Sequence, residues 1–184
     1  MDMATRETRH SQPILPGGDH NSGSRHTASP QPPPRRTPAL EQAYRAADYE
    51  LTTATGRHLF HVDQPAPAVA AWMRHHGLHR LVILTACNPG SQPMSATANA
   101  HRQRQLEAAV RDRGLAAWPA CNRDPQGHWP DEPGLAIAEL PDALLATWLT
   151  DFGQNAALML EPPAAPRLVW HPALGRGRRN ARSD

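Results

Sequence analysis

The chain contains no lysine, because all nineteen of its basic residues are arginine. Without a lysine amine it cannot form a Schiff base, and it has no phosphate-binding lysine of the P-loop kind. Cysteine is also scarce: Cys87 and Cys121 are too few for a disulfide scaffold and are typical of small buried side chains in a reducing compartment. We therefore expect both thiols to be free.

Long apolar runs are missing as well. No stretch reaches the roughly eighteen apolar residues that a membrane span needs. Residues 1–20 lack the apolar segment of a signal peptide. We expect a cytoplasmic protein that makes no membrane contact.

Aromatic residues are few, and none lies in residues 1–38. This segment is rich in Pro, Gly, Ser and Arg, so it cannot bury enough apolar surface to offset the entropy of ordering it. Residues 173–184 form a similar Arg-rich segment. We expect two disordered tails, 1–38 and 173–184, around a single folded domain over residues 39–172.

The charge is divided unevenly between these parts. The two tails hold nine Arg and four acidic residues, a net charge of +5, whereas the folded part holds ten Arg and thirteen acidic residues, a net charge of −3. We therefore do not expect the core to bind nucleic acid. The alternative to a merely solvated C-terminal tail is weak phosphate contact by four arginines: Arg176, Arg178, Arg179 and Arg182.

Hydrophobic periodicity predicts helices and strands throughout the folded part. The predicted helices cover residues 40–47, 65–77, 96–113 and 141–152, and Ser95 is the N-cap of the third. The predicted strands cover residues 49–53, 58–62, 80–87, 115–121, 134–140, 156–161 and 166–170. From residue 80 onward the order is strand, helix, strand, strand, helix, strand, which is the split βαβ plan of ferredoxin-like domains. The predicted fold class is therefore α+β, a ferredoxin-like unit with an N-terminal helix and β-hairpin addition.

This plan brings three polar loops to one edge of the sheet, which we call the polar edge. The loops are NPGSQP at 88–93, NRDPQGHWPDEP at 122–133 and FGQN at 152–155. Amide, hydroxyl and charged side chains are concentrated there and on the helix that follows the first loop. The candidate ligand-binding residues are Asn88, Ser91, Gln92, Asn99, Arg102, Trp129, Glu132 and Gln154.

Two interpretations of the polar edge remain open. Asn99 and Arg102 occupy the first turns of a helix whose inward face continues with Leu106 and Val110. A helix N-terminus and an arginine together favour a carboxylate or phosphate, which predicts a small anionic ligand. The alternative is structural: Arg102 pairs with Glu132, and Asn99 fixes the neighbouring loop.

Glu132 is the candidate catalytic residue. Trp129 and Pro133 flank it and would shield its carboxyl group from water, which raises the pKa toward use as a general acid or base. Three further side chains would then orient a substrate or polarise an oxygen: Asn88, Ser91 and Gln154.

Histidine and cysteine do not form a standard metal-binding pattern. His75, His76 and His79 lack the glutamate of an HExxH motif, and Gly77 interrupts their helix. We expect neither a metal ion nor a cofactor.

The motifs LTACNPGSQPMS, AN and R on the next helix, DPQGHWPDEP, FGQNA and RLVW together resemble the bacterial family catalogued as domain of unknown function 3293. AYRAADYEL extends the resemblance to about residues 40–170. The family has no assigned activity, so the resemblance implies motif positions only: Thr85, Asn88, Pro89, Ser91, Asn99, Arg102, Trp129, Glu132, Phe152, Gly153 and Gln154. Cys87 stands where the family usually has an aromatic residue, and Gly134 where a serine is usual; both departures indicate an altered pocket.

Three classes of function follow. The first is a small binding or regulatory module that takes a small anionic ligand or peptide at the polar edge, with Arg102 and the amides as its contacts and Trp129 as a wall. The second is an enzyme that uses Glu132 as acid or base. The third is a structural interaction module without a ligand. A deep polar pocket favours the first two, and a wide exposed apolar patch favours the third.

Overall fold

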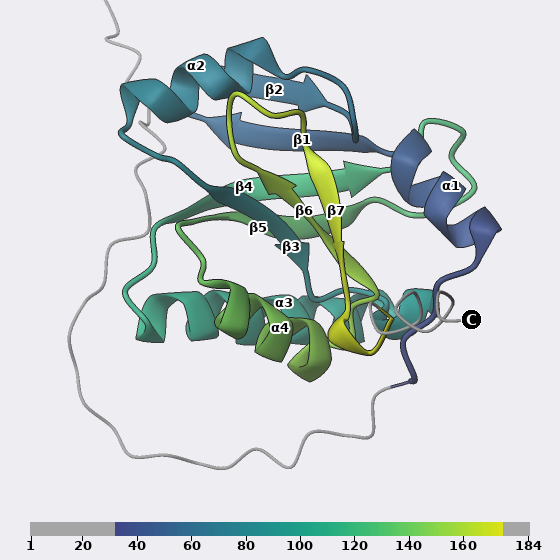
Figure 1. Cartoon of the computed structure of the whole chain (residues 1–184). Coiled ribbons are helices and arrows are strands. Elements are labelled where there is room, and N and C mark those ends of the chain that lie inside the picture. The colour runs from purple at the N-terminus through teal and green to yellow at the C-terminus, as the bar shows by residue number, and fades with distance from the viewer. Residues whose placement is uncertain (1–31, 175–184) are drawn as a thin grey trace, which may run out of the picture.

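The structure is a computed structural model of the chain, and it describes residues 32–174 (Figure 1). The helices are α1 (Pro38–Ala46), α2 (Pro67–His75), α3 (Ala96–Asp112) and α4 (Asp142–Asp151), with a short 3-10 helix at Pro89–Ser91. The strands are β1 (Asp48–Thr53), β2 (Gly56–Phe60), β3 (Leu81–Thr85), β4 (Ala117–Arg123), β5 (Glu132–Ala138), β6 (Ala156–Leu160) and β7 (Arg167–Trp170). Each helix and strand predicted from periodicity is present within a few residues of its predicted bounds. β4 and β5 extend further into the polar loop between them than the sequence indicated, because their pairing continues to Asn122 and Glu132.

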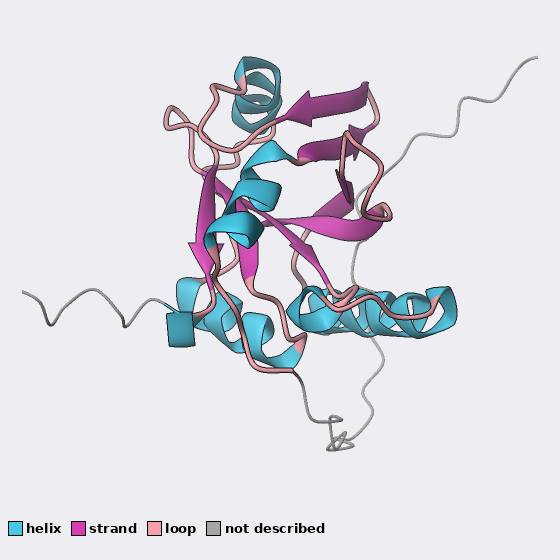
Figure 2. Ribbon diagram, turned by 90° about the vertical axis from the view of Figure 1, so that its right-hand side faces the viewer, coloured by secondary structure: helices cyan, strands magenta, loops and turns pink. Residues whose placement is uncertain are grey.

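All seven strands form one curled sheet in the order β2-β1-β4-β5-β3-β6-β7, and every neighbouring pair is antiparallel (Figure 2). The predicted α+β class is therefore confirmed. The predicted N-terminal hairpin, β1 and β2, extends this sheet, because β1 pairs with β4.

The sheet separates two buried layers of side chains. Leu81 and Ile83 of β3 belong to the layer that contacts α2, whereas Val82 and Leu84 belong to the layer beneath α3 and α4. Figure 1 shows α3 and α4 on one face of the sheet and α2 on the other. Every residue of β3 is buried, as expected for a central strand covered on both faces.

Both cysteines are free, as predicted from their number. Cys87 follows β3 and Cys121 lies in β4, and β5 separates these two strands in the sheet. Two strand spacings of roughly 4.8 Å each place the thiols beyond disulfide reach.

The segment before α1 contacts the polar edge. The backbone N–H of Arg35 donates to Asn155 Oδ1 at 2.7 Å, and the guanidinium of Arg36 lies 4.5 Å from the ring centre of Trp170. Thr37 caps α1 by accepting a hydrogen bond from a backbone N–H of the first turn. The sequence assigned these residues to the N-terminal tail. Residues 1–31 and 175–184, with the four C-terminal arginines, lie outside the described residues.

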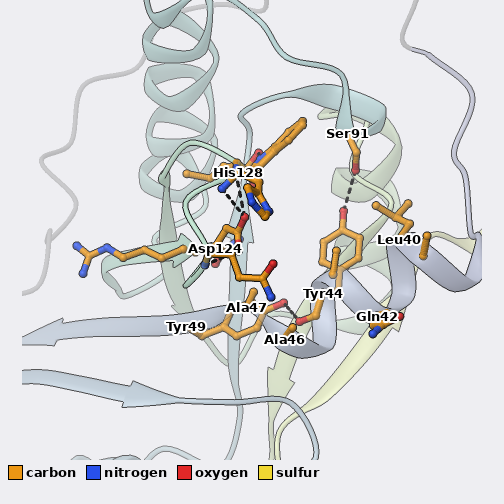
Figure 3. A pocket seen from close by; sticks show the side chains of 16 residues that line it. Leu40, Gln42, Tyr44, Ala46, Ala47, Tyr49, Ser91, Asp124 and His128 are labelled. Carbon is orange, nitrogen blue, oxygen red and sulfur yellow. Dashed lines mark hydrogen bonds between the residues drawn. The ribbon is translucent and has the colours of Figure 1, made fainter.

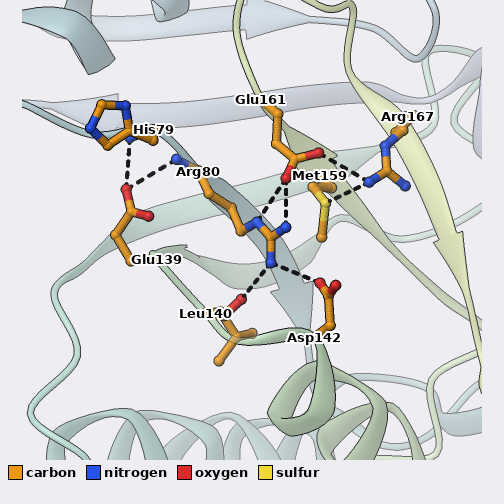
Figure 4. A network of polar contacts seen from close by, with 8 residues as sticks. All are labelled: His79, Arg80, Glu139, Leu140, Asp142, Met159, Glu161 and Arg167. Carbon is orange, nitrogen blue, oxygen red and sulfur yellow. Dashed lines mark hydrogen bonds and ion pairs between the residues drawn. The ribbon is translucent and has the colours of Figure 1, made fainter.

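Charged side chains form a network at the sheet edge opposite the polar edge (Figure 4). Arg80, just before β3, donates to Glu161 Oε1 at 2.6 and 2.9 Å and to Asp142 Oδ1 at 2.7 Å. Arg167 of β7 donates to the other oxygen of Glu161 at 3.0 Å. Together these bonds join the ends of three strands to the first turn of α4.

The strands β3 and β5 approach closely at Gly134. A Cβ atom at this position would lie 2.6 Å from the carbonyl oxygen of Leu84 and 3.3 Å from the Cα of Thr85. Both are backbone atoms of a central strand, so they cannot move aside as a flexible side chain would.

Gly134→Ala is therefore expected to lower the free energy of unfolding by about 2 to 3 kcal/mol, measured by urea denaturation. Gly127→Ala is the matched control: nothing lies within 4 Å of its added Cβ, and only its positive φ of 71° opposes the change. The control substitution should lower the free energy of unfolding by about 1 kcal/mol. Equal losses in the two variants would contradict the close approach of β3 and β5.

Candidate functional site

Backbone and amide hydrogen bonds join two of the polar loops. The N–H of Gly90, after β3, donates to the carbonyl of Gly153, after α4, at 2.7 Å. The side chain of Gln154 is buried and donates to the carbonyl of Cys87 at 2.9 Å. The convergence of these loops, which the strand order predicted, is therefore present.

Asn88 is the centre of the polar edge. Its side chain is 3% exposed, and its backbone adopts the left-handed φ of 47° that asparagine tolerates better than most residues. The Oδ1 atom accepts from Asn99 Nδ2 and from the N–H of Met94, and the Nδ2 group donates to Glu132 Oε1 at 2.8 Å. The N–H of Asn88 donates to Asn99 Oδ1 at 2.9 Å. Asn99 thus fixes the loop after β3, as the structural interpretation expected.

Arg102 hydrogen-bonds to backbone carbonyls. Its Nε donates to Ala86 O at 2.7 Å and its Nη2 to Phe152 O at 2.5 Å, so it joins the end of β3 to the end of α4. Burial lowers the pKa of the guanidinium. Within residues 32–174, Arg102 and Glu132 form no ion pair, so that part of the structural interpretation was wrong.

Glu132, the first residue of β5, is a half-buried carboxylate held by neutral donors. Its Oε1 accepts from Asn88 Nδ2 at 2.8 Å and from the indole Nε1–H of Trp129 at 2.9 Å. Burial raises the pKa of Glu132, and these two hydrogen bonds lower it in part. Among the described residues, no arginine or histidine forms an ion pair with it. The direction of the shift agrees with the shielding that the sequence indicated.

Glu132 lines a pocket of about 510 Å³ between α1 and the loop that joins β4 to β5 (Figure 3). Helix α1 and its C-cap residue supply one wall: Ala39, Leu40, Gln42, Ala43, Tyr44, Ala46 and Ala47. Tyr49, Asn122 and Glu132 come from the strands, and residues 123–129 supply the opposite wall through Arg123, Asp124, Gln126, His128 and Trp129. Ser91 completes the lining. The walls are therefore apolar and aromatic, with polar groups from the strands and the loop.

Tyr44 attaches α1 to the polar edge. Its hydroxyl lies 3.3 Å from Ser91 Oγ, and that oxygen accepts a hydrogen bond from Asn155 Nδ2 at 2.9 Å. Its ring meets Trp170 edge to face with centroids 5.7 Å apart, and its carbonyl accepts from the hydroxyl of Tyr49 at 3.0 Å. Burial raises the pKa of the Tyr44 hydroxyl. These contacts hold α1 in place although none of its residues is buried.

The loop between β4 and β5 is organised by Asp124. Its carboxylate accepts from the backbone N–H groups of Gln126 and His128 at 2.9 Å and of Trp129 at 3.1 Å. These hydrogen bonds lower the pKa of Asp124, so the group is ionised at neutral pH. Asp124 therefore positions Trp129 against Glu132.

Arg123 is the one arginine that lines the pocket among the described residues. Its guanidinium pairs with Glu50 at 2.8 Å and with Asp131 at 3.0 Å, and the charge of Glu50 raises its pKa. Its Nε and Nη1 groups therefore donate to carboxylates that do not line the pocket, and Glu132 has no ion-pair partner among the described residues.

The predicted site residues divide into two groups. Ser91, Trp129 and Glu132 line the pocket, whereas Asn88, Asn99, Arg102 and Gln154 build the frame behind it, and Gln92 is an exposed residue outside the pocket lining. The sequence missed Tyr44, Asn122 and His128. One available signal was that the only two tyrosines of the chain, Tyr44 and Tyr49, flank the junction between a helix and a strand.

Within residues 32–174, no group of three or more His, Cys, Asp and Glu side chains is arranged to hold a metal ion. No helix in this part of the chain has the length and apolar character needed to cross a membrane.

Asn88→Ala should lower the free energy of unfolding by about 2 to 4 kcal/mol, because it removes the partner of Asn99 Nδ2 and of the Met94 N–H, and one of the two donors to Glu132. Asn155→Ala is the matched control, since this buried amide lies in the next loop but does not contact Glu132. The indole N–H resonance of Trp129 should move in the Asn88 variant and stay in place in the Asn155 variant. If thermal melts and the indole resonance do not distinguish the two variants, Asn88 is not the centre of the network.

The comparisons with known proteins give one match. The model of the family described as "Protein of unknown function (DUF3293)" matches residues 84–157, which run from the end of β3 into β6. Neither the curated proteins nor the solved structures contain a match to this chain. The matched segment includes the loop after β3, helix α3, the loop between β4 and β5, and the loop after α4. The resemblance seen in the sequence motifs is thereby confirmed over residues 84–157, which match the model of the family of domain of unknown function 3293.

Proposed function

We propose that this protein is a small-molecule-binding module whose ligand occupies the pocket beside α1, with Glu132 as its polar anchor. One observation carries the proposal: a half-buried carboxylate without a charged partner among the described residues lines a pocket of about 510 Å³. A pocket of this size falls within the range of roughly 300 to 1,000 Å³ that is usual for small-molecule sites.

The energetics of Glu132 support binding over a purely structural role. Removing a carboxylate from water costs free energy unless another charge compensates it. Asn88 and Trp129 offset part of this cost with hydrogen bonds to Oε1 alone, and among the described residues Oε2 has no hydrogen-bond partner. A scaffold would be more stable with a neutral amide there, so the carboxylate is best explained by something that binds it.

A docking surface for a macromolecule has less support. Within residues 32–174, only Leu59 and Met94 are large exposed hydrophobic residues, and they lie on separate elements. Single exposed apolar side chains are usual on soluble domains.

The proposed ligand site differs from the anion site that the sequence suggested at Arg102. The sequence suggested an anion at Arg102, but its Nε and Nη2 already donate to backbone carbonyls, and it does not line the pocket. In this proposal Arg102, Asn99 and Gln154 support the site, and the residues that contact the ligand are Tyr44, Ser91, Asn122, His128, Trp129 and Glu132.

A second candidate function is an enzyme in which Glu132 gives or accepts a proton. Its support is the raised pKa of Glu132, which moves the group toward the range useful for acid–base catalysis. Tyr44, Tyr49 and Cys87 surround it, and burial raises all three of their pKa values, so they stay protonated while Glu132 titrates. Turnover of a bound compound that Glu132→Gln abolishes without loss of binding would establish this function.

Two finer assignments belong to the same proposal. We assign β3, α3, β4, β5, α4 and β6 to a ferredoxin-like split βαβ unit; the adjacent order β4-β5-β3-β6, with α3 and α4 on one face, supports it. We also place the protein in the cytoplasm, away from nucleic acid; its free thiols and the net charge of −3 over residues 39–172 support this.

Ala43→Phe tests the location of the ligand. Ala43 is exposed on α1 and lines the pocket, so a phenyl group can fill the space without disturbing the core. The variant should melt like the parent but lose the thermal shifts produced by compounds from a metabolite library. Ala143→Phe, an exposed alanine on α4 outside the pocket, should keep every shift. Shifts that survive in the Ala43 variant would place the ligand elsewhere.

The pH dependence of stability tests whether Glu132 is uncompensated. Because its pKa is raised in the folded protein, the folded state binds a proton more tightly than the unfolded state, and stability falls as pH rises from the ordinary glutamate pKa of about 4.3 through the raised value. Glu132→Gln should therefore increase the melting temperature at pH 7.5, and this gain should shrink toward pH 4.

Glu161→Gln is the matched control with the opposite sign. Hydrogen bonds from Arg80 and Arg167 lower the pKa of Glu161, so its charge stabilises the folded state above the ordinary glutamate pKa. The Glu161 variant should melt lower than the parent at pH 7.5, and the difference should disappear as the pH falls through the lowered pKa. A Glu132 variant that follows the Glu161 pattern would show that a cation already compensates Glu132.

A further inference from the structure

The charges that line the pocket differ in how fully they are compensated. Arg123 is paired with Glu50 and Asp131, and the carboxylate of Asp124 is bound by three backbone N–H groups. Glu132 receives two neutral hydrogen bonds, both at Oε1. Neither Asp124 nor Glu132 forms an ion pair among the described residues, and Glu132 receives fewer hydrogen bonds, so the charge that an incoming ligand meets is negative.

The aromatic rings around this carboxylate favour the same kind of partner. Tyr44, Tyr49 and Trp129 line the pocket together with Glu132. The faces of tyrosine and tryptophan rings attract cations, and this attraction is stronger where water is excluded. The wall that α1 supplies consists mainly of alanines, with Leu40 and Gln42, so this side of the pocket suits an apolar body.

A negatively charged ligand would bind this pocket less favourably. It would bring a like charge close to Glu132, and the guanidinium of Arg123 is directed to Glu50 and Asp131. A ligand that complements this pocket therefore carries a positive charge on a compact apolar body.

We propose that the ligand is an organic amine, protonated at neutral pH, whose ammonium group pairs with Glu132 while its apolar body lies against Tyr44 and Trp129. This inference rests on the proposed function, because it names the class of compound that the same pocket takes.

Three probes of one shape test the charge preference: benzylamine, benzyl alcohol and benzoate, which are cationic, neutral and anionic at pH 7.5. Binding is followed by the indole Nε1–H resonance of Trp129 in ¹⁵N-labelled full-length protein, assigned by its loss in Trp129→Phe. This N–H donates to Glu132, so it reports contact at the carboxylate. Benzylamine should bind about ten-fold or more tightly than benzyl alcohol, because a hydrogen bond between charged groups is stronger than one to a neutral group. Benzoate should bind least.

Two variants determine whether the preference comes from Glu132. In Glu132→Gln, benzylamine should bind no more tightly than benzyl alcohol. Glu161→Gln removes a carboxylate at the opposite edge of the sheet and should leave the preference unchanged (Figure 4).

The possible results distinguish a failure of the amine class from a failure of the proposed ligand site. If the three probes bind with equal affinity, or if benzoate binds best, the pocket is a ligand site but the amine class is overturned. If a preference for benzylamine survives in Glu132→Gln, the cation pairs elsewhere and the inference fails. If none of the probes moves the Trp129 resonance at millimolar concentration, both the amine class and the pocket as a ligand site are overturned.

Discussion

The hydrogen bond between Asn88 and Glu132 joins two parts of the sheet that are far apart in the sequence. Asn88 follows β3 and Glu132 begins β5, and the same amide holds Asn99 at the start of α3. The Asn88 side chain hydrogen-bonds to Asn99 of α3, to the backbone N–H of Met94 and to Glu132, so it links the loop after β3 to the carboxylate that lines the pocket. The site depends on this arrangement, since without it the carboxylate could turn toward bulk solvent.

One side of the pocket is formed by paired strands of the sheet, and the other by helix α1 at the periphery of the fold. Its rigid side comes from the ends of β4 and β5, whose residues pair in register through Asn122 and Glu132. Its peripheral side is α1, which has no buried residue and is held by the contacts of Tyr44 and by an ion pair between Arg45 and Asp63. A carboxylate on the rigid side and an apolar helix on the other together define a site with one polar anchor.

Most of the fold could be predicted because the signals are local. The continuous apolar run of β3, the cap at Ser95 and the glycines after the helices each identify an element or its end. The site was only partly predictable. Trp129 and Glu132 were found because they lie three residues apart in a polar loop, and Asn99 was recognised as a support. The role of Tyr44 was missed because it depends on α1 packing beside a loop 47 residues away. The role of Arg102 stayed open because sequence cannot distinguish an arginine that binds backbone carbonyls from one that binds an anion.

The position of α1 also bears on how such a site can change over evolutionary time. Seven of the residues that line the pocket lie on this helix or at its end, yet none of the helix contributes to either buried layer of the domain. Substitutions at Ala39, Ala43 or Ala46 can therefore reshape the wall at little cost to folding, while β3, β4 and β5 continue to present the same carboxylate. The architecture separates the residues that determine ligand shape from those that maintain the sheet, so selection can diversify the first without endangering the second.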